Sequence, residues 1–175
     1  LEHSVKRGEF TLKSGARSSW FLDTKQTACR PDGILLVADA MLAVIPDDVS
    51  SIGGVTMGAD PVSFGVAAVA ATRGRSLRSF SVRKEAKGHG VRGRLAGALE
   101  PGDRVVITED TTTRGTTLIE AVDVVLLPQA HEGVPGAIGV LAVLHSLQRG
   151  LLVEGARIVH VVERDVLEVL ARHLE

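Results

Sequence analysis

The sequence has few aromatic residues, a single cysteine and no strong charge of either sign. Aromatic residues make up 3% of the 175 positions, with no tyrosine and one tryptophan, which argues against a stacking platform for single-stranded nucleic acid. The lone cysteine excludes a disulfide framework and a cysteine-rich zinc site, and it fits a reducing cytoplasm. A net charge of −1 argues against a surface built throughout for nucleic acid.

Long apolar runs are also missing. No run reaches the roughly 18 residues that span a bilayer, and the opening LEHSVKRGEF holds no signal-peptide core. We therefore expect neither a membrane nor a nucleic-acid partner. The length predicts a single domain over residues 1–175, and the missing initiator methionine predicts a truncated N-terminus.

Apolar runs of two lengths alternate along the chain. They predict helices over 34–44, 60–71, 115–127 and 165–174, and strands over 49–52, 77–82, 104–108, 138–144 and 157–162. This alternation predicts an α/β fold, with a mainly parallel sheet flanked by helices on both faces. Ligands bind such sheets at the carboxyl ends of the strands. The polar, glycine-bearing segment 83–94 predicts a mobile loop.

An acidic pair and a hydroxyl-rich loop follow the strand predicted over 104–108. Glu109 and Asp110 come first, then a run of threonines, Arg114, Gly115 and the start of a helix. Backbone N–H groups at a helix N-terminus bind a phosphate monoester, and neighbouring carboxylates hold sugar hydroxyls or a Mg²⁺-linked group. The order favours a phosphorylated sugar over the alternative, a strand end with solvated acids and a threonine cap.

A basic segment follows the strand predicted over 77–82. Residues 83–90 read Arg-Lys-Glu-Ala-Lys-Gly-His-Gly. Such a charge run is usually a solvated surface. Here it directly follows a buried strand, and a cationic loop in that place can close over a dianionic leaving group and exclude water.

Four segments in this order and spacing resemble the orotate phosphoribosyltransferases, which belong to the type I phosphoribosyltransferase family. Residues 83–90 resemble the family's catalytic loop, and residues 109–117 its phosphoribosyl pyrophosphate (PRPP) motif. Residues 8–23 resemble its early substrate segment, and residues 53–61 its pyrophosphate-side loop. The resemblance spans about residues 8–120 and implies a Rossmann-like type I phosphoribosyltransferase fold with a mobile catalytic loop.

The resemblance also implies an activity. The family transfers ribose 5-phosphate from PRPP to orotate, which gives orotidine 5′-monophosphate and pyrophosphate in de novo UMP synthesis. It is cytoplasmic and uses Mg²⁺, held mainly through PRPP rather than by direct protein ligands. Its members are homodimers that share the catalytic loop across subunits.

Site residues carry over by motif position. The candidate catalytic residues are Lys84, Lys87, His89 and Asp110, with Lys84 acting in the partner's site. Glu109 and Asp110 would hold the ribose hydroxyls. The candidate PRPP-binding residues are Lys13, Arg83, Lys84, Lys87, His89, Glu109, Asp110, Thr111, Thr112, Thr113, Arg114, Gly115, Thr116 and Thr117. The candidate orotate-binding residues are Phe21, Leu22, Thr113 and Ser146.

Two positions depart from the family pattern. Gly58 stands where many members carry a lysine that contacts PRPP. His145 and Ser146 replace an Asp-Arg pair whose arginine binds the orotate carboxylate, and Arg149 is a candidate substitute. Two alternatives therefore stay open: a phosphoribosyltransferase for another base, and a non-catalytic PRPP-sensing regulator on the same fold.

Overall fold

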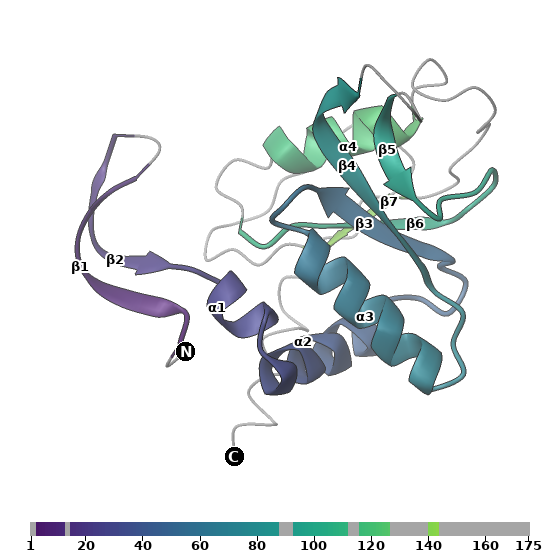
Figure 1. Cartoon of the computed structure of the whole chain (residues 1–175), viewed down its shortest axis with the longest axis horizontal. Helices are drawn as coiled ribbons and strands as arrows, with labels where there is room; N and C mark the ends of the chain where they lie inside the picture. Colours follow the sequence, from purple (N-terminus) through teal and green to yellow (C-terminus); the bar gives the residue numbers. More distant parts are fainter. Residues whose placement is uncertain (1–2, 13–14, 88–92, 112–115, 127–139, 144–175) are drawn as a thin grey trace.

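The structure, a computed structural model, describes residues 3–12, 15–87, 93–111, 116–126 and 140–143. An antiparallel hairpin is formed by β1 (Val5–Thr11) and β2 (Arg17–Leu22). A separate sheet has the order β5-β4-β3-β6-β7 (Figure 1). Its strands are β3 (Ser51–Val55), β4 (Arg78–Lys87), β5 (Gly93–Gly97), β6 (Val105–Thr108) and β7 (Val140–Val143). Within the described chain β5 alone runs antiparallel to its neighbour in this sheet, so the predicted mainly parallel sheet is confirmed.

Helices cover both faces of the five-stranded sheet, as predicted. They are α1 (Lys25–Ala28), α2 (Pro31–Val44), α3 (Asp60–Thr72) and α4 (Thr116–Leu126). Figure 1 shows α2 and α3 on one side of the sheet and α4 on the other. Proline in the first turn of α2 and of α3 suits a helix start, because that N–H has no partner inside the helix.

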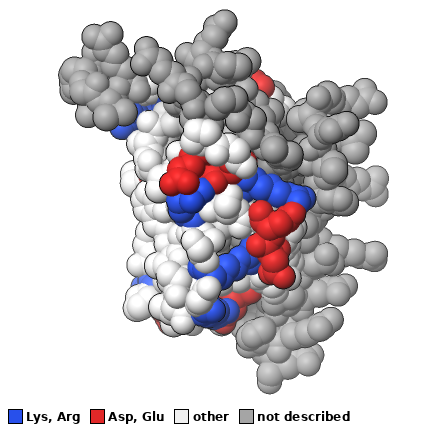
Figure 2. All heavy atoms as spheres, turned by 90° about the vertical axis from the view of Figure 1, so that its right-hand side faces the viewer, with Lys and Arg blue, Asp and Glu red and all other residues white. Residues whose placement is uncertain are grey.

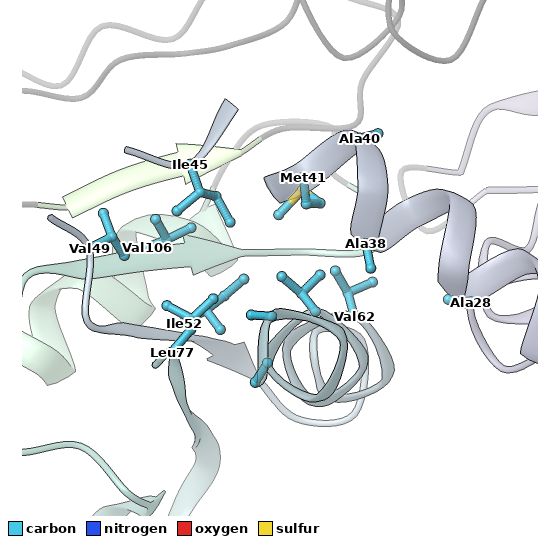
Figure 3. Packing of buried hydrophobic residues seen from close by; sticks show 13 residues of the cluster. Ala28, Ala38, Ala40, Met41, Ile45, Val49, Ile52, Val62, Leu77 and Val106 are labelled. Atoms are coloured by element: carbon cyan, nitrogen blue, oxygen red, sulfur yellow. The ribbon is translucent and has the colours of Figure 1, made fainter. Parts of the chain in front are cut away.

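Alternation along the strands divides the core in two. Ile52 and Val106 point to the α2–α3 side, where they pack with Met41 and Val62 (Figure 3). Val105 and Ile107 face the α4 side, in a cluster that also contains Val55, Phe80, Val82, Leu95, Leu118 and Ala121. Consecutive residues of a strand point to opposite faces, so each central strand contributes to both clusters. The sheet is therefore fixed from both sides, and its strand ends are held in place.

The basic segment differs from its prediction as a loop. β4 continues through Lys87, and β5 begins at Gly93 and pairs with it in antiparallel register, Lys87 opposite Gly93. Charge and glycine content pointed to a loop. Beyond Val82, however, β4 extends past its pairing with β3 and pairs with β5, and a strand with an exposed face tolerates polar side chains there. Residues 88–92 lie outside the described part of the chain.

The N-terminal hairpin lies beside the main body and joins it through α1 (Figure 1). The hydroxyls of Ser4 and Thr27 are 2.5 Å apart, and the backbone N–H of Asp23 donates to the Ser4 carbonyl at 2.8 Å. These contacts fix the base of the hairpin to α1. The strand predicted over 157–162 and the helix predicted over 165–174 lie outside the described residues. None of the described helices is long and apolar enough to cross a membrane.

The amino ends of the strands carry paired charges. Asp103, which is 5% exposed, accepts from the hydroxyls of Ser50 and Ser51 at 2.9 and 2.6 Å and forms an ion pair with Arg78. Arg78 also pairs with Glu100 at 2.9 Å. Figure 2 shows the side of the molecule where these ends lie, with basic and acidic side chains interleaved. Because these opposite charges pair with one another, they hold the amino ends of β3, β4 and β6 together.

Candidate active site

Three segments meet at the carboxyl ends of β3 and β6. The turn 56–59 follows β3, residues 109–111 follow β6, and Thr24 and Lys25 lie at the start of α1. The turn can close on the acidic pair because Gly58 has no side chain: a Cβ there would lie 2.5 Å from Glu109 Oε1 and 2.6 Å from Asp110 Oδ1. The loops of two neighbouring strands thus form one site, where a parallel sheet of this kind binds its ligands.

Asp110 is held by donors from two directions. The ammonium of Lys25 donates to Oδ2 and forms an ion pair with it, and the Thr24 hydroxyl donates to the same oxygen at 3.3 Å. The backbone N–H of Thr111 donates to Oδ1 at 2.9 Å. Burial raises the pKa of Asp110, but the hydrogen bonds from Lys25 and Glu109 outweigh it and hold the pKa below its usual range. Asp110 is therefore the ionised member of the pair.

The pKa of Glu109 is shifted in the opposite direction. Burial, a hydrogen bond to the Asp110 side chain and the negative charge of Asp110 raise its pKa from 4.5 to about 7. Its Oε1 accepts from the backbone N–H of Asp110 at 3.2 Å. Two adjacent carboxyl groups cannot both ionise freely at this spacing. The pair therefore offers acceptor oxygens for hydroxyl groups together with one proton that is exchanged near neutrality.

Helix α4 begins shortly after the acidic pair in the sequence. α4 starts at Thr116, only five positions after Thr111, and Thr116 is exposed while Thr117 is half-buried. The first N–H groups of a helix have no partner inside it, and they attract phosphate. The predicted helix start at residue 115 is confirmed to within one residue.

The basic hairpin is braced by its own arginines. Arg83 donates from Nη1 to the carbonyls of Gly93 and Leu95, at 3.2 and 3.5 Å. Arg94 donates to the Arg83 carbonyl at 2.7 Å and forms an ion pair with Glu120 of α4. Lys84 is exposed, and Lys87 ends β4 opposite Gly93. The guanidinium of Arg83 thus links the two strands of the hairpin, and Lys84 takes no part in these hydrogen bonds.

The predicted orotate positions Phe21 and Leu22 lie at the end of β2. Phe21 is 42% exposed, and the centroid of its ring lies 5.6 Å from that of the Phe10 ring. Leu22 is half-buried and pairs with Val5. Two residues further on, Thr24 touches Asp110, so the strand that carries these positions leads directly to the acidic pair.

The other predicted site residues lie outside the described part of the chain; they are Lys13, His89, Thr112, Thr113, Arg114, Gly115 and Ser146. The structure also adds two residues that the sequence reasoning missed, Thr24 and Lys25. Lys25 is 85 positions from Asp110, and no spacing rule connects them. The available signal was their place directly after the early substrate segment.

Comparisons with known proteins identify the family of the chain. An orotate phosphoribosyltransferase from Rhodopirellula baltica is 36% identical over 129 residues, which cover 70% of this chain and 67% of the relative. The crystal structure of the Mycobacterium tuberculosis enzyme with inorganic phosphate aligns with a TM-score of 0.63 at 30% identity, over 81% of this chain and 76% of that one. The chain belongs to the orotate phosphoribosyltransferase family. Its predicted type I phosphoribosyltransferase fold is confirmed by these neighbours.

Another member of the orotate phosphoribosyltransferase family, from Nostoc sp., is 39% identical over 121 residues, which cover 69% of this chain and 59% of the relative. The chain thus spans about three-fifths of the length of this relative. No family model matches the chain.

Proposed function

We propose that this protein transfers ribose 5-phosphate from PRPP to orotate and releases pyrophosphate, the phosphoribosyl step of UMP synthesis. The observation that carries the proposal is the acidic pair after β6, which faces the Gly58 turn and immediately precedes the threonine loop and α4. Membership of the orotate phosphoribosyltransferase family supports it. A further structure of the M. tuberculosis relative contains PRPP, at 29% identity to this chain.

The reaction is a displacement at the anomeric carbon of the ribose. A bond forms between N1 of orotate and that carbon, and N1 gives up its proton to the medium. The bond to the pyrophosphate oxygen breaks, and its electron pair leaves with the pyrophosphate. Positive charge builds on the ribose, and negative charge builds on the leaving group. No covalent nucleophile is required, so the task of the protein is orientation and charge stabilisation.

The acidic pair orients the ribose. Asp110 is ionised and accepts from a ribose hydroxyl, and Glu109 supplies the neighbouring acceptor. The N–H groups at the start of α4, with residues Thr111–Thr117, hold the 5′-phosphate. A ribose that is bound through its hydroxyls and its 5′-phosphate presents its anomeric carbon in one direction. This fixed orientation raises the rate of the displacement.

Cations of the basic hairpin bind the pyrophosphate as it departs. We assign this role to Lys84, Lys87 and His89, with Lys13 and Arg83 as further PRPP contacts. Lys84 is exposed on the hairpin, which suits a contact across a homodimer with the partner's site. Interactions that strengthen as negative charge develops lower the barrier rather than the KM.

Mg²⁺ would enter the site with PRPP. The described residues contain no group of three His, Cys, Asp or Glu side chains that could hold a metal, but a Mg²⁺ ion is commonly held by substrate phosphates and water with few protein ligands. When bound, the ion neutralises charge on the pyrophosphate. Glu109 and Asp110 would then hold the hydroxyls of the ribose to which that pyrophosphate is attached. Because the substrates are small phosphate esters and bases, we place the reaction in the cytoplasm.

The identity of the base that accepts the ribose 5-phosphate is the part of the proposed function for which a second candidate exists. Phe21, Leu22, Thr113 and Ser146 would contact orotate, but Ser146 offers no guanidinium for the carboxylate. A charge-assisted hydrogen bond of that kind contributes about 1.5–3 kcal/mol. This replacement favours, as the second candidate, a phosphoribosyltransferase for another base.

The test is to mix the protein with PRPP and Mg²⁺, and then with orotate, uracil or a purine base in separate reactions. Loss of orotate absorbance is the expected result. Turnover with another base alone would select the second candidate, and PRPP binding without turnover would identify a regulator.

A Lys87→Ala variant is expected to lose at least about tenfold in kcat. Lys6→Ala removes a surface lysine of β1 instead and should leave the rate unchanged. Full activity in Lys87→Ala would refute the role given to the hairpin.

A further inference from the structure

The first residue of α1 is joined to the acidic pair. Lys25 contacts Asp110 Oδ2, to which Thr24 also donates at 3.3 Å. The side chain of Asp110 is only 10% exposed, whereas that of Lys25 is 39% exposed. A nearly buried carboxylate thus takes two donors from a segment 85 and 86 positions earlier in the chain.

Both oxygens of the Asp110 carboxylate have donors, although its side chain is still 10% exposed. Gly58 packs against Oδ1, which also accepts from the Thr111 N–H at 2.9 Å. Lys25 and Thr24 occupy Oδ2. With both oxygens engaged, the carboxylate plane has one orientation. The ionisable groups that act on Asp110 in the described chain are Lys25 and Glu109.

A plain surface ion pair is the competing explanation. Such a pair exists on the same segment, where Lys6 lies 3.6 Å from Asp23 and both side chains are more exposed, at 50% and 24%. Exposed pairs contribute about 0–1 kcal/mol to stability and little else. Lys25 differs because its partner is largely buried and belongs to the acidic pair of the active site.

We propose that Lys25 is a positioning residue, which with Thr24 fixes the orientation of the Asp110 carboxylate so that it can accept a ribose hydroxyl. This inference rests on the proposed function. Lys25 also directly follows the strand with the predicted orotate positions Phe21 and Leu22, so the same short segment serves both substrates. Loss of the ammonium would leave Asp110 facing Glu109 without its counter-charge. Thr24 and the Thr111 N–H would be its remaining donors, so the carboxylate would be less firmly oriented and would bind a proton more readily.

The experiment compares Lys25→Met and Lys25→Arg with Lys6→Met, the matched surface control. We expect Lys25→Met to raise the KM for PRPP, and its calorimetric dissociation constant, by about tenfold, which is roughly 1.4 kcal/mol. The kcat should change much less, since a saturating substrate restores the orientation. Lys25→Arg should return both values to within about threefold, because a guanidinium also donates to a carboxylate. Lys6→Met should equal the wild type.

A carboxyl titration of the free protein by NMR gives a readout that does not depend on turnover. The signal of Asp110 is assigned by its disappearance in Asp110→Asn. In Lys25→Met its pKa should rise, and in Lys25→Arg and Lys6→Met it should stay low. An unchanged Asp110 titration in Lys25→Met would overturn the proposal, and so would equal losses of PRPP affinity in Lys25→Met and Lys6→Met. A wild type that binds PRPP but consumes no orotate would refute the proposed function alone, because both comparisons can still be made.

Discussion

Substitution of Gly58 by alanine tests how the site is assembled. The added Cβ would sit 2.5 Å from Glu109 Oε1 and 2.6 Å from Asp110 Oδ1, about 0.9 and 0.8 Å short of ordinary contact at 3.4 Å. Gly58 has no positive φ, so alanine adopts the backbone without strain. The carboxylates must therefore move by most of an ångström. Misplacement by about 1 Å can cost 100-fold in rate, and we expect kcat/KM for PRPP to fall about 10- to 100-fold.

The stability of the same variant should change little. The atoms that must move belong to side chains and not to the backbone. Asp110 would keep its donors after a small shift, so the melting temperature should fall by less than about 4 °C. Gly54→Ala is the matched control, since its Cβ would lie 2.0 Å from the backbone carbonyl oxygen of Thr108. That carbonyl belongs to the sheet and cannot retreat, so we expect a loss of about 1–3 kcal/mol.

Steady-state kinetics with PRPP, calorimetric PRPP binding and thermal melts separate the two effects. Wild-type kcat/KM in Gly58→Ala would refute the close approach of the turn to the acids. A loss of stability in Gly58→Ala equal to that in Gly54→Ala would refute the argument that side-chain ends, rather than backbone, absorb the change.

Three further outcomes follow from buried groups. The pKa of Glu109 is raised from 4.5 to about 7, so between these pH values the folded state holds a proton that the unfolded chain has lost. The free energy of unfolding should therefore fall by about 1–2 kcal/mol from about pH 5 to pH 8. In urea melts, Glu109→Gln should lack this pH dependence. The two Ser hydroxyls, the Glu100 N–H and Arg78 outweigh burial and lower the pKa of Asp103, so its stabilisation is present at neutral pH and is lost below about pH 4. Asp103→Asn should cost about 2–4 kcal/mol at neutral pH and weaken the acid dependence in melts. Phe80 is fully buried, so Phe80→Ala should cost about 3–5 kcal/mol in the same melts, and a loss under about 1 kcal/mol would contradict its place in the core.

The pattern of apolar residues was sufficient for the central elements. The helices predicted over 34–44 and 60–71 are α2 and α3, and the strand predicted over 104–108 is β6 to within a residue. Buried strands and packed helices have strong periodicity, which is a local property of the sequence. The strands β1, β2 and β5 and the end of β4 were missed. A strand needs only hydrogen-bonding partners, and where one of its faces is exposed the side chains there can be polar, so the alternation of apolar residues is weak.

The sequence by itself determined which chemical groups lie along one loop: the acids at 109 and 110, the threonines after them and the helix start that follows. These are neighbours in the chain, so their proximity does not depend on the rest of the fold. Only the tertiary structure decided what surrounds them. Gly58 and Lys25 reach Asp110 from positions 52 and 85 residues earlier, because parallel strands end at the same edge of the sheet and α1 packs beside it. That packing, which no local pattern encodes, buries both acids and brings Lys25 to Asp110. The pKa of Asp110 is therefore lowered, and burial together with the neighbouring Asp110 raises the pKa of Glu109 to about 7.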